Sequence, residues 1–226
     1  SNGLWPSFMP GKLKRVPLAA DYGVTQREGN ARVMFTNRID GDKGSIYSQV
    51  TYTVYRDGDI GVSAAIDIDS NYVHLPRVGL SFTAPEGFKA LHWYGRGPGE
   101  SYCDRKLAAP VGRYSSSVEE THFPFVPVSH NGSHADTRWF ALEDEDGSRI
   151  TVEGSLFSFD VHHNTVEDYW NAYHEHELVR RDEVYINIDG AMAGIGGNMA
   201  WSTQLDPKHK VFAGKHHFEF LMSFTD

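Results

Sequence analysis

Strict alternation of apolar and polar side chains over residues 60–69 is the feature that most limits how this chain can fold. One face of this stretch carries Ile60, Val62, Ala64, Ile66 and Ile68. The opposite face carries Ser63, Asp67 and Asp69. Successive side chains of a β-strand point to opposite faces of its sheet, so a period of two predicts a half-buried strand.

Two Asp-Gly pairs predict hairpins that place such strands side by side. Val50, Tyr52 and Val54 alternate with polar residues just before the first strand, and Asp57-Gly58 stands between the two segments. The segment 138–154 repeats the arrangement and turns at Asp146-Gly147. Asp-Gly between alternating segments is a strong hairpin signal, because these residues tolerate the left-handed backbone of a tight turn.

The rest of the chain extends this pattern. Residues 183–189 predict a strand with Val184, Ile186 and Ile188 inward, and the C-terminal strand carries Phe218, Phe220, Met222 and Phe224. Only 165–178 has the pattern of a short helix. The 226 residues include 13% aromatic residues and 22 glycines, which suits a twisted sheet with many turns. We therefore predict an all-β fold, a single antiparallel β-sandwich of many strands.

Charge and composition exclude several classes of protein. The formal net charge of −9 and the lack of a basic run disfavour nucleic acids and anionic membranes as partners. No apolar stretch approaches the roughly 18 residues that a membrane helix needs. Cys103 is the single cysteine, which excludes an intrachain disulfide, and no signal peptide is evident. These features predict a cytoplasmic location, and Ser1-Asn2 resembles an expression remnant.

Histidines and carboxylates are numerous, but their spacing does not define a catalytic or metal site. His174 and His176 would share a strand face, and His162 and His163 are adjacent. Zinc sites need three or four ligands at recognisable spacing, so we expect hydrogen-bonded histidines and no metal. No nucleophile elbow, phosphate-binding loop or zinc-protease motif is present. No two carboxylates are singled out as the pair, about 5–10 Å apart, that glycoside hydrolysis requires.

A glycine-rich turn follows the strand that ends near Tyr94. It comprises Gly95, Gly97, Pro98, Gly99, Glu100, Tyr102, Asp104 and Arg105. Glycines around a proline predict a tight, irregular turn. Two interpretations remain open: a structural turn pinned by an Arg–carboxylate pair, which the chemistry favours, and a polar rim that binds sugar.

A second glycine-rich loop, 194–205, ends in a large indole. Gly194, Gly196 and Gly197 precede Asn198, and Trp201 follows shortly after. Glycine lets a backbone approach another surface closely, and tryptophan offers a broad apolar face with one N–H donor.

These motifs together resemble the C-terminal β-sandwich of glycoside hydrolase family 2 β-galactosidases, which is also found as the small chain of two-chain forms. The resemblance rests on the 95–105 turn and on ordered segments at 75–80, 136–142, 174–178 and 184–197 that run into Trp201. It covers roughly residues 30–224. No counterpart of the family's Arg-Ala-Pro-x-Asp-Asn-Asp segment is found. We therefore predict a leading segment at 1–29, which includes the tag, and the sandwich domain at 30–226.

The resemblance implies the supersandwich fold that galactose mutarotases also have. It places both catalytic glutamates on a separate barrel, so no catalytic residue is expected in this chain. The sandwich is expected to close one side of the galactoside pocket with Trp201 as its substrate-binding residue. The alternative that stays open is that Trp201 packs inside the sandwich and has no contact with sugar. Loop and rim residues would be Gly194, Gly196, Gly197, Asn198, His130 and Asn131.

The same resemblance sets the expected partners and cofactors. The partners would be the barrel and other domains of the enzyme or its large chain, together with the galactoside, and an oligomer through the full enzyme is left open. No cofactor is expected on this chain, although the full enzymes often use Mg and Na.

Two departures from the family pattern put lactose specificity in doubt. Asn198, Met199 and Ala200 stand where an acidic and a hydroxyl residue are common. Val128, Ser129 and His130 replace the usual Pro-Gln-Glu.

Two other functions stay open at this stage. One is a mutarotase-like epimerase, for which His162, His163 and His174 are the candidate histidines, and which a mutarotation assay would identify. The other is a free-standing carbohydrate-binding module, which glycan binding by the isolated chain would identify.

Overall fold

The structure is a computed structural model, and it describes residues 11–225 except 26–28, 127 and 197–204. Its strands are β1 (Lys14–Thr25), β2 (Asn30–Gly41), β3 (Gly44–Val54), β4 (Ile60–Ile68), β5 (Arg77–Ala84), β6 (Ala90–Arg96), β7 (Val111–Ser117), β8 (His134–Glu143), β9 (Arg149–His162), β10 (Val184–Met192) and β11 (Gly214–Thr225). The helical elements are α1 (Val166–Asn171) and 3₁₀ turns at Glu119–Thr121, Glu175–Glu177 and Pro207–His209.

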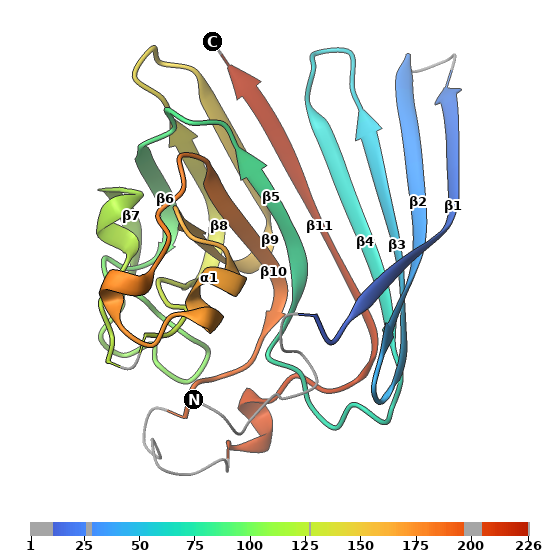
Figure 1. Ribbon diagram of the computed structural model, residues 1–226. Coiled ribbons are helices and arrows are strands. Elements are labelled where there is room, and N and C mark those ends of the chain that lie inside the picture. Colours follow the sequence, from blue (N-terminus) through green and yellow to red (C-terminus); the bar gives the residue numbers. More distant parts are fainter. Residues whose placement is uncertain (1–10, 26–28, 127, 197–204, 226) are drawn as a thin grey trace.

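The strands form a large antiparallel sheet with a smaller second layer. The large sheet has the order β1-β2-β3-β4-β11-β9-β8-β6-β7. The second layer branches from β9, because residues 158–162 of this strand pair with β10, which in turn pairs with β5. Figure 1 shows β5 and β10 in front of the middle of the large sheet. The predicted all-β antiparallel sandwich is confirmed.

The core lies between these two layers, and period-two alternation builds it. Val62, Ala64, Ile66 and Ile68 are buried as predicted, whereas Asp67 is exposed. The same core takes Ile186 and Ile188 from β10, as well as Phe220 from β11. Stacked rings of Phe140 and Phe159, 4.3 Å apart between centroids, fill its centre.

The predicted turns and the predicted helix are confirmed. Gly58 and Gly147 have φ values of +96° and +93°, and each lies between the paired strands of its hairpin. Helix α1 begins after Thr165, whose hydroxyl accepts a hydrogen bond from the Asp168 N–H. The Asp168 carboxylate accepts one from the Thr165 N–H in return, which satisfies two backbone donors at the start of the helix.

The range 1–29 contains a strand of the sheet. β1 pairs with β2 from Lys14↔Asp40 to Thr25↔Asn30, with one bulge between Pro17 and Ala19. The boundary predicted at residue 30 therefore falls between two paired strands. Among the described residues, no helix has the length and apolar character needed to cross a membrane.

Candidate functional site

Three loops that are distant in sequence meet at one end of the sandwich. They are the turn after β6, the loop that leads into β8, and the chain that leaves β10. The Ser101 N–H donates to the Ser133 carbonyl at 2.7 Å, which joins the first two loops. The Gly196 N–H donates to the Asp104 carboxylate at 2.7 Å, which joins the first and third. The structure thus brings together the two glycine-rich motifs that the sequence singles out.

Asp104 holds the start of the second glycine-rich loop. Its two carboxylate oxygens accept the N–H groups of Ile195, at 3.1 Å, and of Gly196. A Cβ atom at Gly194 would lie 2.5 Å from the carboxylate carbon, and Gly196 has a φ of +79°. These two glycines therefore serve a contact within this chain. Of the other predicted residues in this loop, Gly197, Asn198 and Trp201 lie outside the described residues.

Glu100 organises the turn after β6. One of its carboxylate oxygens lies 3.2 Å from Nη1 of Arg105, and the other accepts hydrogen bonds from Tyr102 Oη at 3.1 Å and from the Gly132 N–H at 3.2 Å. Arg105 is 46% exposed, whereas Glu100 is 15% exposed. Burial and the adjacent Glu100 raise the pKa of Tyr102. These contacts are of the kind that the first interpretation, a pinned structural turn, requires. Gly95, Gly97 and Pro98 lead into it, with a cis Gly97–Pro98 peptide bond.

A buried polar cluster lies beneath the loops. Arg77 of β5 donates to Asp160 of β9 at 2.7 Å and to Asp189 of β10, with its Nε 2.9 Å from Asp189 Oδ1. His130 Nε2 lies 3.2 Å from Asp160 Oδ1, and His162 Nε2 lies 2.7 Å from the Asn131 carbonyl oxygen. The cluster ties the second layer to the large sheet, because each charged partner comes from a different strand.

Contacts within the protein and burial set the protonation of this cluster. Burial would raise the pKa of Asp160, but the Arg77 guanidinium and His130 outweigh burial and hold that pKa well below its usual range. Burial raises the pKa of Asp189 despite the same guanidinium. Burial also lowers the pKa of His162 to about 3, so this imidazole is neutral near pH 7.

Within the part of the chain that the structure describes, two groups of side chains have ligand atoms close enough together for a metal. His130, Asp160 and His162 form one, and the exposed His174, His176 and Glu177 form the other. In the first group, the Asp160 carboxylate already forms an ion pair with Arg77. This buried ion pair competes with the binding of a metal ion to the same carboxylate. The second group is fully exposed, and clusters of that kind are common on protein surfaces without an ion.

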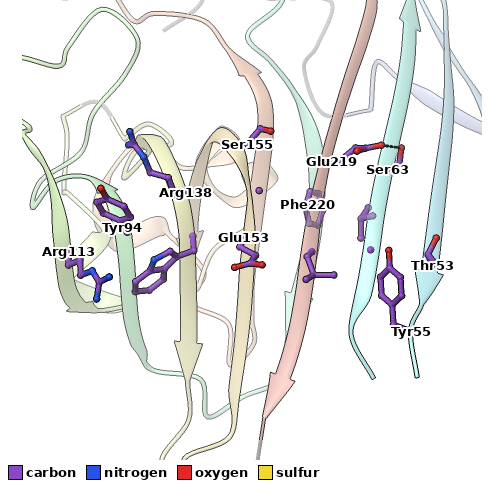
Figure 2. Close-up of a pocket in the computed structure, with 15 residues that line it drawn as sticks. Thr53, Tyr55, Ser63, Tyr94, Arg113, Arg138, Glu153, Ser155, Glu219 and Phe220 are labelled. Carbon is purple, nitrogen blue, oxygen red and sulfur yellow. Dashed lines mark hydrogen bonds between the residues drawn. The ribbon is translucent and has the colours of Figure 1, made fainter. Parts of the chain in front are cut away.

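A hollow of about 880 Å³ lies on the face of the large sheet opposite the core. Figure 2 shows Tyr94, Arg113 and Arg138 on one side of it and Ser63 and Glu219 on the other. Both guanidinium carbons lie over the Tyr94 ring, Arg113 at 5.9 Å and Arg138 at 5.2 Å from its centre. Such cation–π contacts hold the arginines in place.

Glu153 extends from β9 in the same hollow (Figure 2). Among the described residues, neither Glu153 nor Arg113 has an ion-pair partner. Trp139 also lines the hollow. Aromatic and multiply hydrogen-bonding side chains around one hollow can bind a polyhydroxylated ligand. The sequence analysis missed this site. Its residues alternate with core residues along their strands, and this alternation could have shown that they share the outer face of the sheet.

Known proteins resemble this chain over most of its length. The family model described as the β-galactosidase small chain matches residues 11–222. A β-galactosidase of Vibrio cholerae is 35% identical over 172 residues, which is 76% of this chain and 16% of that protein. A β-galactosidase of Streptococcus thermophilus is 31% identical over 208 residues, covering 91% of this chain and 19% of that protein. The chain therefore spans less than a fifth of the length of these relatives.

Solved structures are similar in fold at low sequence identity. A GH36 α-galactosidase of Geobacillus stearothermophilus, in complex with raffinose, matches with a TM-score of 0.52 and 10% identity, over 94% of this chain and 28% of that one. A putative aldose 1-epimerase of Escherichia coli K12 matches with a TM-score of 0.45 and 10% identity, over 92% of this chain and 69% of that one.

Proposed function

The chain belongs to the β-galactosidase small-chain family, and from this premise we propose that it is a non-catalytic domain that closes one side of a galactoside pocket. The relatives are several times longer, so the barrel and other domains, or a large chain, are the partners that we propose. Both catalytic glutamates of the retaining reaction would lie on that barrel. We also keep a cytoplasmic location as a prediction.

The observation that carries this proposal is the Asp104 clamp at the base of the second glycine-rich loop. Asp104 fixes the backbone at Ile195 and Gly196, only a short distance along the chain from Trp201. A fixed base lets a loop present a large side chain at low entropic cost. We propose that Trp201 stacks on the apolar C–H face of galactose, while other domains bind the sugar hydroxyls. Asp104 acts on the sugar only through this loop and is a positioning residue.

The proposed cofactor arrangement follows from the buried cluster. The full enzymes often use Mg and Na, and we propose that these ions bind outside this chain. His130, Asp160 and His162 are the most enclosed set of ligating side chains in the described residues, but Arg77 contacts the carboxylate that a cation would need.

Substitution of Trp201 in the complete enzyme tests the proposal. Trp201→Ala should weaken galactoside binding by about 1–3 kcal/mol, on the scale of losing one large buried apolar contact. Trp170→Ala, which changes a half-exposed tryptophan on α1, is the matched control and should leave binding unchanged. Asp104→Ala should reproduce part of the loss. Unchanged galactoside affinity in Trp201→Ala would contradict the proposed role.

The isolated 226-residue chain should hydrolyse no β-galactoside, because we place both catalytic glutamates elsewhere. A nitrophenyl β-galactoside provides a sensitive assay for the purified chain. Turnover that disappears when a carboxylate of this chain is mutated would overturn the proposal.

The hollow on the sheet supports a second candidate function, the carbohydrate-binding module. Tyr94 with its two arginines, Trp139 and Glu153 lie side by side at paired positions of β6, β8 and β9 and line a hollow of about 880 Å³. If this function holds, the isolated chain binds glycans in calorimetric titration and Arg113→Ala weakens that binding, whereas Lys89→Ala at a surface ion pair does not. The epimerase alternative has less support, since His162 is buried against the Asn131 carbonyl and His174 is exposed on a 3₁₀ turn.

A further inference from the structure

The large sheet is wider than the layer that covers it. β5 and β10 lie over its middle, whereas neither of them lies in front of β1 and β2 in Figure 1. The strand register shows which side chains face this uncovered space. Tyr22 pairs with Val33, and Val33 pairs with Tyr52, which packs against the core. Side chains at paired positions share a face, so Tyr22 and Val33 point to the same side as the core.

The face that β1 and β2 turn toward the core side is apolar where it is uncovered, whereas Ile46 and Val50 on the same face of β3 are buried. Tyr22 is 85% exposed, Val24 68% and Phe35 42%. The opposite face of the same strands carries polar residues, among them Arg32, Thr36, Gln49, Thr51 and Thr53. Sheets with one buried face have this division, and a contiguous exposed apolar patch marks an interaction surface. The patch has the composition of a core that lacks its second layer.

The strand that borders this patch has a free edge. β5 pairs with β10 on one side, and among the described residues no strand pairs along its other side. That edge faces a groove of about 370 Å³, which Phe35, Tyr52, Leu80 and Phe82 line. Exposed edges are normally protected by lysine, proline or a bulge. Residues 78–84 of β5 contain no lysine and no proline. The pairing of β5 with β10 has a bulge only between Asp189 and Ala191, near one end of the strand.

We propose that an extended segment from the remainder of the β-galactosidase pairs with the free edge of β5 and covers the exposed inner face of β1 and β2. This inference rests on the proposed function, since it takes the rest of the enzyme as the occupant. The relatives contain this sequence within chains of which it makes up only 16% and 19%, so ample polypeptide exists to supply a strand. A strand added at a free edge gains backbone hydrogen bonds, and its alternate side chains would enter the groove.

The groove also defines the chemistry of this segment. Its inward side chains should be apolar, because Phe35, Leu80 and Phe82 line the groove. Arg15 lines one part of it and has no ion-pair partner among the described residues. An acidic residue of the incoming segment would therefore be favourable beside Arg15. The outward side chains would continue the row of Ser81 and Thr83, which is exposed and polar.

Thiol labelling tests whether the face is covered. Tyr22→Cys in a Cys103→Ser background should react with a maleimide about ten-fold or more slowly in the complete enzyme than in the isolated chain, because access controls thiol reactivity. Asp57→Cys, in the exposed hairpin turn, is the control and should react equally in both. Equal rates for Tyr22→Cys would overturn the proposal.

Hydrogen exchange of the unmodified protein gives a second measurement that does not depend on a variant. Amides of residues 77–84 should be protected in the complete enzyme more strongly than in the isolated chain. Sedimentation of the isolated chain must accompany it, since strong protection in a dimer of this chain would make a second copy the occupant and overturn the proposal. Galactoside binding by Trp201→Ala reports on the proposed function separately, so failure of one can be distinguished from failure of the other.

Discussion

The large sheet has a covered part, which lies beneath β5 and β10, and an open part, which β1 and β2 form. Apolar and polar residues alternate in both parts, but the apolar residues are buried only in the covered part. In the covered part, Phe159 and Val152 are completely buried beneath the second layer. In the open part, Tyr22 and Val24 occupy equivalent inward positions and are mostly exposed. Alternation therefore specifies which face of a strand is apolar, but it does not specify whether that face is covered within the same chain. Stability should accordingly be concentrated in the covered part.

The largest effect is expected where charge is buried. Arg77→Met removes the guanidinium between Asp160 and Asp189 and leaves two buried carboxylates without a counter-charge. The free energy of unfolding should fall by about 3–5 kcal/mol, as for other buried ion pairs that lose one partner. Urea unfolding of the 226-residue chain measures it. Arg15→Met in the open part is the control, and an equal loss there would contradict the comparison.

Truncation of a buried aromatic side chain should also destabilise the covered part far more than truncation of an exposed one destabilises the open part. Phe159→Ala would leave a cavity beside Phe140 and should cost about 3–5 kcal/mol. Tyr22→Ala removes an aromatic ring from the same kind of strand position in the open part, and should change stability by less than about 0.5 kcal/mol. Thermal and urea unfolding of the two variants give the difference. Similar losses for both would mean that the open face is covered in the isolated chain.

The pH dependence of stability should also originate in the covered part. The unfolded chain binds a proton at His162 below pH 6.5, whereas burial keeps the folded histidine neutral down to its pKa of about 3. The unfolded state therefore binds more protons, and stability falls as the pH drops below 6.5. Loss by pH 4 should be about 3 kcal/mol. His162→Gln should lose about 3 kcal/mol of this dependence and keep the part due to His134, because burial also lowers the pKa of His134 to about 4. The exposed His176→Gln should keep the whole dependence, and equal slopes for all three proteins would show that His162 is not buried and neutral.

A surface ion pair should have a smaller effect than any of these buried groups. Arg105 is nearly half exposed, so solvent screens its interaction with Glu100. Arg105→Ala should cost less than about 1 kcal/mol. Glu100→Ala should cost more, because Tyr102 Oη and the Gly132 N–H would both lose their acceptor. The reverse order of the two variants in thermal unfolding would contradict this account of the turn.

Local rules predicted much of the fold from the sequence. The alternation at Val62–Ile68, the hairpin glycines Gly58 and Gly147, and the short helix after Thr165 all depend on neighbouring residues. The branching of β9 could not be predicted in this way, because it depends on pairing with β10 and β11 in different halves of one strand.

The candidate site was predictable only in part for the same reason. The sequence identifies Asp104 and Gly194 as members of two motifs but gives no sign that these motifs are in contact. The hydrogen bonds from Ile195 and Gly196 to Asp104 join residues that lie 91 and 92 positions apart. The Arg77–Asp189 contact spans a still longer separation. Tyr22 and Phe35 look like ordinary strand residues in sequence, and only the fold reveals that their face is uncovered.

Hydrogen exchange of the isolated 226-residue chain tests the division into a covered and an open part most directly. Amides of β8 and β9 should exchange only through global unfolding, whereas amides of β1 and β2 should exchange through local opening, faster by roughly 100-fold or more. Two separate classes of protection are the result that we predict. Equal protection of β1–β2 and β8–β9 would contradict the division, and with it the inference that the rest of the enzyme completes this sandwich.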